Sequence, residues 1–134
     1  MGAWGYGVFD DDTTCDFVDD IADSDDPLQM LVNAFRDANG ADYLEYDRGC
    51  AVWVSAVVID AILNGTKYSD AVENFKSFIA THKKLPAKNL KNDAIKALEK
   101  LLGENSELHE LWSENEELYP KWKEGILQLK GRLQ

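Results

Sequence analysis

Apolar residues recur at intervals of three and four along most of the chain, with polar residues between them. This spacing gathers the apolar side chains on one face of an α-helix, whereas a half-buried strand would alternate them at every second residue. Helix-start and helix-end signals, such as a capping Ser or Asp, a first-turn Pro or a terminal Gly, bound seven such segments. The expected helices are a short one capped by Asp12 or Thr13, one from Asp26-Pro27 to Asn39-Gly40, one over about 47–64, one from near Ser69, one between Pro86 and Gly103, a short one opened by Ser106, and a last one with Pro120 in its first turn.

The third of these segments is the most apolar part of the chain. Residues 51–63 read AVWVSAVVIDAIL and are apolar nearly all round, so we expect this helix at the centre of the protein. The run is 13 residues long and contains Asp60, whereas a membrane-spanning helix needs about 20 apolar residues. We expect Asp60 to be exposed on the outer face of the helix. The alternatives are a pairing inside the protein with Arg48 or a tyrosine, and a functional role.

Length and composition fit one globular domain. The 134 residues suffice to bury a core without metal or disulfide, and 45% hydrophobic with 29% charged residues is a globular profile. No internal repeat, low-complexity tract or linker interrupts the helical pattern. We therefore predict an all-α fold: a single compact bundle of about five to seven helices over residues 1–134, with an N-terminal arm of glycines and aromatic residues packed on it.

The first dozen residues, MGAWGYGVFDDD, are the most distinctive part of the chain. The glycines permit backbone conformations closed to other residues, so Trp4, Tyr6 and Phe9 are expected to insert between helices as anchors. A phosphate-binding loop fits this segment less well. No strand precedes the glycines, no Lys follows them, and three aspartates would repel a phosphate.

The same segment resembles a family of short bacterial proteins of unassigned function with the N-terminal signature W-G-x-G-x-F-x-[ND]-D. The matching positions are Trp4, Gly5, Gly7, Phe9, Asp11, Asp12 and the pair Asp16-Phe17, and further similar segments are Asp26-Pro27-Leu28, residues 107–112 (ELHELW) and Trp122. The family commonly has Asn where this chain has Asp11. The resemblance spans the chain and implies a helical fold in which Trp4, Gly5, Gly7, Phe9 and Phe17 are structural residues. It implies no activity, cofactor or active site.

The charge of the chain is negative and unevenly distributed. The net charge is −11, with 14 acids and two bases in residues 1–66 against 11 acids and 12 bases in residues 67–134. Nine aspartates lie between Asp10 and Asp26. Such a field repels nucleic acid and anionic membranes and attracts a basic protein, so we expect a basic protein partner. The candidate partner-binding residues are Asp10, Asp11, Asp12, Asp16, Asp19, Asp20 and Asp23.

Other interpretations of the aspartates are a solvated face that caps a helix and a metal site. A calcium loop is not indicated, because residues 10–15 lack its sixth-position glycine and distal glutamate. His109-Glu110 begins an H-E-x-x-H zinc motif that ends in Ser113 instead of a second histidine. We predict no metal, no cofactor and no catalytic residues.

Neither the cysteines nor the lysines indicate a catalytic or binding site. Cys15 and Cys50 form no pair motif, and the aspartates around Cys15 should raise its pKa, which opposes activation as a nucleophile. Lysines between Lys83 and Lys100 are expected on a solvated helix face. No secretory signal pattern follows Met1, so we expect a cytoplasmic protein with reduced thiols.

The sequence thus favours an acidic protein-binding module, such as an immunity-type inhibitor that neutralises a basic toxin, for example a nuclease. Two alternatives from other classes stay open. One is a small enzyme with an acid-lined cleft between helices, and the other is a self-associating scaffold protein. The partner and the oligomeric state do not follow from the sequence.

Overall fold

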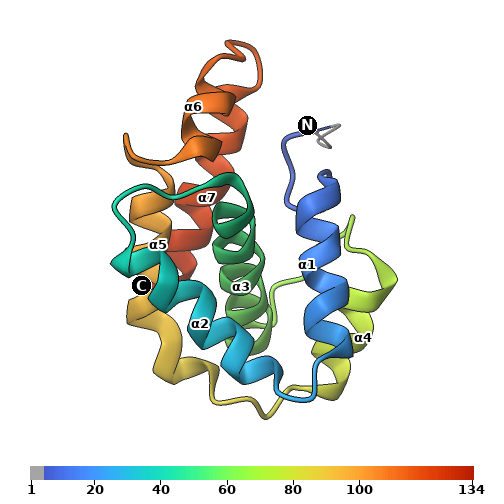
Figure 1. Ribbon diagram of the computed structural model, residues 1–134. Helices are drawn as coiled ribbons and strands as arrows, with labels where there is room; N and C mark the ends of the chain where they lie inside the picture. Colours follow the sequence, from blue (N-terminus) through green and yellow to red (C-terminus); the bar gives the residue numbers. More distant parts are fainter. Residues whose placement is uncertain (1–4) are drawn as a thin grey trace.

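The computed structural model describes residues 5–134, and Figure 1 shows helices joined by loops in this part of the chain. Its elements are α1 (Asp12–Asp23), α2 (Pro27–Gly40), α3 (Tyr46–Asn64), α4 (Glu73–Thr81), the 3₁₀ helix η1 (Ala87–Leu90), α5 (Lys91–Leu101), α6 (Glu107–Ser113) and α7 (Tyr119–Leu133). The predicted all-α fold of five to seven helices is confirmed. No helix within residues 5–134 is long and apolar enough to cross a membrane.

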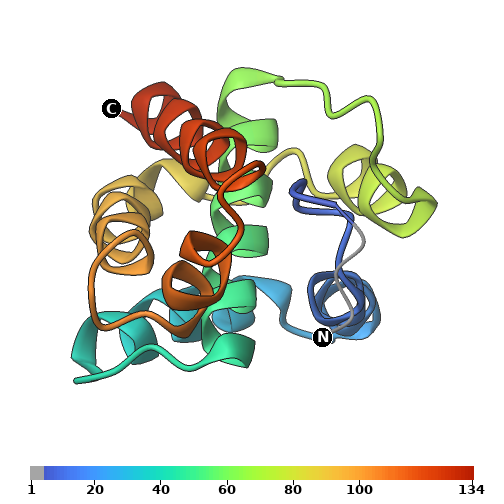
Figure 2. The ribbon, with the colours of Figure 1, turned by 90° about the horizontal axis from the view of Figure 1, so that it is seen from above.

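Helix α3 forms the centre of the protein, as its apolar sequence predicts. The residues from Val52 to Ala61 are all buried, and α3 contacts every other helix. Figure 2 shows the remaining helices placed around it. Gly65 ends the helix with a φ of 67°, a left-handed conformation that favours glycine.

The other helices pack on α3 in two groups. Helices α1 and α4 contact each other on one side, while α5 and α7 contact each other on the opposite side (Figure 1). Helix α2 contacts α3 and α5, and α6 contacts α3 and α7. The apolar residues of all these elements join one core, so the groups share their buried surface through α3.

An isolated parallel β-bridge joins the loop before α3 to the start of α6. The backbone N–H of Leu44 donates to the carbonyl of Asn105 at 2.8 Å, and that of Glu107 donates to the carbonyl of Leu44 at 2.9 Å. The Glu107 carboxylate then accepts from the backbone N–H of Tyr46 at 3.0 Å. These bonds fix the first turn of α3 against α6.

Most predicted helix starts agree with the structure. Asp26 caps α2 by accepting from the N–H of Gln29, and Ser106 caps α6 by accepting from the N–H of His109. Helix α4 begins at Glu73 and not near Ser69, because the Ala71 N–H bonds to the carbonyl of Tyr68 and closes a turn there. The segment after Pro86 begins as the 3₁₀ helix η1 and becomes α-helical only at Lys91.

Candidate functional site

The N-terminal arm folds back on the side chain of Asp10. The Asp10 N–H donates to the carbonyl of Gly7 at 3.0 Å, and the Gly7 N–H donates to Oδ2 of Asp10 at 3.1 Å. A Cβ atom on Gly5 or Gly7 would lie 2.5 Å or 2.9 Å from the same Oδ2. The two glycines therefore let the backbone approach a carboxylate that any larger residue would displace. Asp10 is half-buried and shapes this turn.

Phe9 anchors the arm to the helices. It is buried and packs edge-on against Phe75 of α4, with ring centroids 4.9 Å apart, and against Tyr68 at 6.2 Å. Phe17 of α1 is partly buried against the same core. The expected structural roles of Gly5, Gly7, Phe9 and Phe17 are thus consistent with their positions, whereas Trp4 lies outside the described residues.

Tyr6 does not insert between helices as expected. Its side chain is 43% exposed, and the ammonium group of Lys121 lies 5.9 Å from the centre of its ring. The turn at residues 7–10 directs the neighbouring Val8 and Phe9 into the core instead. The arm is therefore held by Val8 and Phe9.

The cap of α1 is Asp11, and not Asp12 or Thr13 as predicted. Asp11 was also a candidate for an exposed binding surface, but the structure buries it. The residue is only 3% exposed. Its Oδ1 accepts from the N–H of Thr13 at 2.7 Å, and its Oδ2 accepts from the hydroxyl of Tyr46 on α3. Burial, together with the hydrogen bond to Asp11, raises the pKa of Tyr46 above its ordinary value. Both carboxylate oxygens of Asp11 are thus hydrogen-bonded within the protein.

Five other predicted aspartates share the outer side of α1. The inward side of the helix carries Thr14, Val18 and Ile21. Its outer side carries five carboxylates, each three or four positions from another of the set. We call this set the acidic face; its members, all exposed, are Asp12, Asp16, Asp19, Asp20 and Asp23. Helix α1 contains no basic residue. The structure therefore joins five of the seven predicted partner-binding residues into one surface.

Asp60 is the second buried acid, and its expected exposure on the outer face of α3 is wrong. Its side chain is 0% exposed and accepts hydrogen bonds from Asn64 Nδ2 (2.8 Å), Thr66 Oγ1 (3.0 Å), Tyr68 OH (2.6 Å) and Arg132 Nε (3.0 Å). The alternative of an internal pairing is correct for a tyrosine, but the cation is Arg132 and not Arg48.

The hydrogen bonds decide the charge state of Asp60. Burial works to raise the pKa of its carboxyl, but donation from Asn64, Tyr68 and Arg132 outweighs burial and holds the pKa below its ordinary value. The group is therefore an ionised carboxylate whose acceptor positions are occupied within the protein. Arg132 lies 72 positions away in the sequence, so no local pattern indicated it.

The histidines and cysteines take structural positions. His109 Nε2 lies 2.8 Å from the hydroxyl of Tyr119, and His82 stacks on Phe78 with ring centroids 4.1 Å apart. Burial raises the pKa of the Cys50 thiol, and burial followed by the charges of nearby aspartates raises that of Cys15. Within residues 5–134, no group of three or more His, Cys, Asp or Glu side chains is placed to hold a metal ion.

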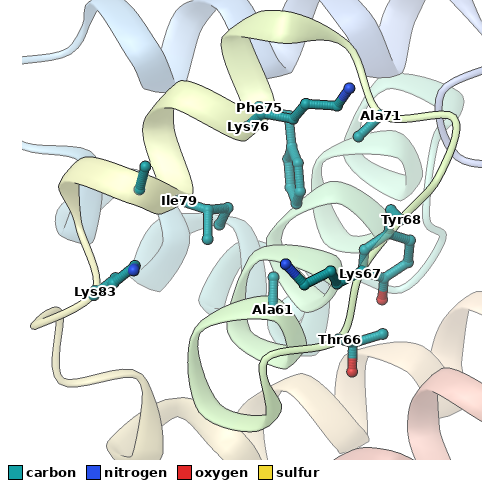
Figure 3. A pocket seen from close by; sticks show the side chains of 10 residues that line it. Ala61, Thr66, Lys67, Tyr68, Ala71, Phe75, Lys76, Ile79 and Lys83 are labelled. Carbon is teal, nitrogen blue, oxygen red and sulfur yellow. The ribbon is translucent and has the colours of Figure 1, made fainter.

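A hollow lies between α4 and the segment that follows α3, and no sequence pattern indicated it. Its volume is about 440 Å³. Apolar side chains of α3, α4 and the intervening segment form its floor, and Lys67, Lys76 and Lys83 belong to its lining. In Figure 3 the ring of Phe75 and the side chain of Lys67 both point into this space. We call it the lysine hollow.

The acidic side chains discussed above do not line a common cleft between helices. Those of the acidic face lie on the outer side of one helix, while Asp11 and Asp60 are engaged in separate buried hydrogen-bond networks. The feature that best matches the sequence prediction is therefore the acidic face.

Comparisons with known proteins place the chain in a family without assigning it an activity. Neither the curated proteins nor the solved structures gave a match. A family model described as a domain of unknown function, DUF4259, matches residues 2–125. This match covers most of the chain, including the arm, the acidic face and the lysine hollow. The chain therefore belongs to the DUF4259 family.

Proposed function

We propose that this protein is an acidic protein-binding module that docks a basic protein against the acidic face of α1. The observation that carries the proposal is the arrangement of Asp12, Asp16, Asp19, Asp20 and Asp23 on one side of a helix that has no basic residue. Like charges placed so close together raise the local negative potential. A positively charged partner surface relieves that repulsion on binding.

Geometry also supports the acidic face as one side of an interface. Its carboxylates are exposed and project from a helix held by Val18 and Ile21 on its inner side, so the charges are displayed on a fixed frame. Of the five, only Asp19 accepts a hydrogen bond from another helix, from Asn74 of α4 at 2.6 Å, among the residues that the structure describes. The remaining carboxylates are free to accept from Lys or Arg side chains of a partner.

An apolar depression beside the acidic face offers a place for an anchor residue. It has a volume of about 210 Å³ and lies between α1, α2 and α3. Its lining is apolar at Phe17, Met30, Ala34 and Ala51 and polar at Asn33, Asp37 and Arg48. Phe17 is adjacent to Asp16 and one turn from Asp20. Apolar anchors surrounded by charged residues are the usual composition of protein interfaces.

The specific form of this function that we propose is inhibition of a basic toxin, such as a nuclease, in the manner of an immunity protein. A nuclease that binds a polyanion presents a cationic surface, which a dense row of carboxylates complements. Electrostatic steering would make such an association fast, which suits an inhibitor that must act before its target does.

The test uses two variants with the same net charge. In the first, the five residues of the acidic face are changed to Asn. In the second, Glu104, Glu114, Glu116, Glu117 and Glu124, exposed acids outside α1, are changed to Gln. Each set shifts the net charge from −11 to −6. Wild-type protein and both variants are immobilised and exposed at low salt to extract from the cells that produce the protein.

The proposal expects a basic protein to be retained by the wild type and by the Glu→Gln variant but not by the Asp→Asn variant. An equal loss of retention in the two variants would show that net charge, and not the acidic face, governs binding, and would contradict the proposal. Retention that persists with the Asp→Asn variant would overturn the proposal.

A further inference from the structure

The lysine hollow differs in chemistry from the rest of this acidic protein. Its floor is apolar, made by Ala61 of α3, Ala71, and Phe75 and Ile79 of α4. Its volume of about 440 Å³ falls in the range of small-molecule sites. A ligand with an apolar body would bury that body against this floor and displace water from it.

The cationic groups surround this apolar floor. Lys67 reaches into the space from the segment after α3, and Lys83 lies at its other end, just after α4 (Figure 3). Neither has a carboxylate within 4.0 Å among the described residues, whereas Lys76 lies 3.8 Å from the exposed Glu73. Lys67 and Lys83 are therefore the ammonium groups available to an anion.

The buried network of Asp60 fixes one wall of the hollow. Thr66 and Tyr68 both line the hollow and both donate their hydroxyl protons to Asp60, while Arg132 donates to the hydroxyl of Tyr68 at 3.2 Å. These bonds leave the ring of Tyr68 as an apolar surface and occupy its polar end. The wall is thus formed before any ligand arrives, which lowers the cost of ordering it.

We infer that the lysine hollow binds a small amphiphilic carboxylate, with its hydrocarbon part on the Phe75 and Ile79 floor and its carboxylate paired with Lys67 or Lys83 at one end of that floor. Lysine suits this head group because its ammonium is a compact point charge that pairs with a single anionic group. The site does not depend on the acidic face, because none of the aspartates of α1 lines it.

The experiment titrates octanoate into the wild-type protein and follows backbone amide chemical shifts by NMR in about 0.15 M salt, where charges more than about 8 Å away are screened. Octanoate is expected to shift amides of residues 66–83. 1-Octanol, with the same chain and no charge, is expected to bind about two- to five-fold more weakly. Hexanoate is expected to bind about two- to four-fold more weakly for each methylene removed.

Two double variants separate the site from general attraction to lysines. Lys67→Ala with Lys83→Ala is expected to reduce octanoate affinity to that of octanol, and both side chains are exposed, so the fold should persist. Lys88→Ala with Lys96→Ala, which removes exposed lysines outside the hollow, is expected to leave affinity unchanged. Equal affinity for octanoate and octanol, shifts centred outside residues 66–83, or unchanged binding by the first variant would overturn the inference.

Discussion

Arg132 on α7 donates from Nε to Oδ2 of Asp60 on α3 at 3.0 Å, although the two residues lie 72 positions apart. Asn64 reinforces this link, since its Nδ2 donates both to Asp60 and to the backbone carbonyl of Arg132. The end of the chain is thereby tied to the end of the central helix. The same carboxylate accepts hydrogen bonds from Thr66 and Tyr68. One buried charge therefore joins the end of α3, the segment that follows it and α7.

Replacing this carboxylate should weaken the fold. Asp60→Asn removes the charge and one acceptor oxygen while several donors still point at the site, so we expect a loss of about 2–3 kcal/mol in the free energy of unfolding. The figure lies below that for a fully buried ion pair because the Arg132 side chain is 36% exposed. Urea unfolding measures the loss.

The matched control for this substitution is Glu99→Gln. Glu99 lies 3.9 Å from Lys130 in an ion pair whose carboxylate side is 56% exposed. Exposed pairs contribute about 0–1 kcal/mol, so this variant should unfold nearly as the wild type does. A comparable loss in both variants would contradict the special role of Asp60.

The lowered pKa of Asp60 predicts that the free energy of unfolding depends on pH. A carboxyl whose pKa is lower in the folded state contributes stability above its unfolded pKa of about 3.9, and this contribution is lost as the pH falls through the lower folded value. The difference in unfolding free energy between wild type and Asp60→Asn should therefore narrow below about pH 4. Urea unfolding at a series of pH values tests this, and a difference that stays constant or widens would contradict it.

Asp11 should matter for stability and not for binding a partner. Asp11→Ala removes both the cap of α1 and the acceptor of the Tyr46 hydroxyl, and should cost about 1–3 kcal/mol. Asp11→Asn keeps a side-chain oxygen for the cap and should cost less. Thermal unfolding orders the two variants, and partner association by Asp11→Asn should match the wild type, because the residue is buried.

The glycines of the arm should be intolerant of larger residues. Gly7→Ala places a Cβ 2.9 Å from Oδ2 of Asp10, so the carboxylate must move away from the Gly7 N–H that it accepts from. The lost hydrogen bond should destabilise the protein by about 0.5–1.5 kcal/mol. The double variant with Asp10→Ala should lose less than the sum of the two single changes, because the clash disappears with the carboxylate.

Gly125→Ala provides the opposite case. A Cβ at this position in α7 meets nothing within 4 Å, and alanine favours a helix more than glycine does. This variant should gain up to about 1 kcal/mol in unfolding free energy. A loss of stability at Gly125, or no loss at Gly7, would contradict the role given to close contact at the arm.

The parts of the fold that depend on local sequence were predictable. The 3.6-residue spacing identified the helices, and Asp26 and Ser106 marked two of their starts. The predicted start near Ser69 was wrong because the hydrogen bond of Tyr68 to the distant Asp60 accompanies a turn there. Tertiary contacts of this kind leave no periodic signal.

The candidate site likewise combines features set by local sequence with features set by tertiary contacts. The sequence showed the density of aspartates, and the structure adds that residues such as Asp12, Asp16 and Asp23 share one side of α1. The inward turn of Asp11 depends on Tyr46, which lies on another helix. The lysine hollow likewise joins Lys67 and Lys83 from separate segments, so only the folded chain reveals it.

The association rate constant with a captured basic partner, measured against ionic strength, tests the central proposal most directly. We expect association of the wild type and of the five-residue Glu→Gln variant to slow steeply between low and high salt. The Asp→Asn variant of the acidic face should associate slowly at low salt and respond little to added salt. An Asp→Asn variant that kept both the wild-type rate and its salt dependence would contradict the account.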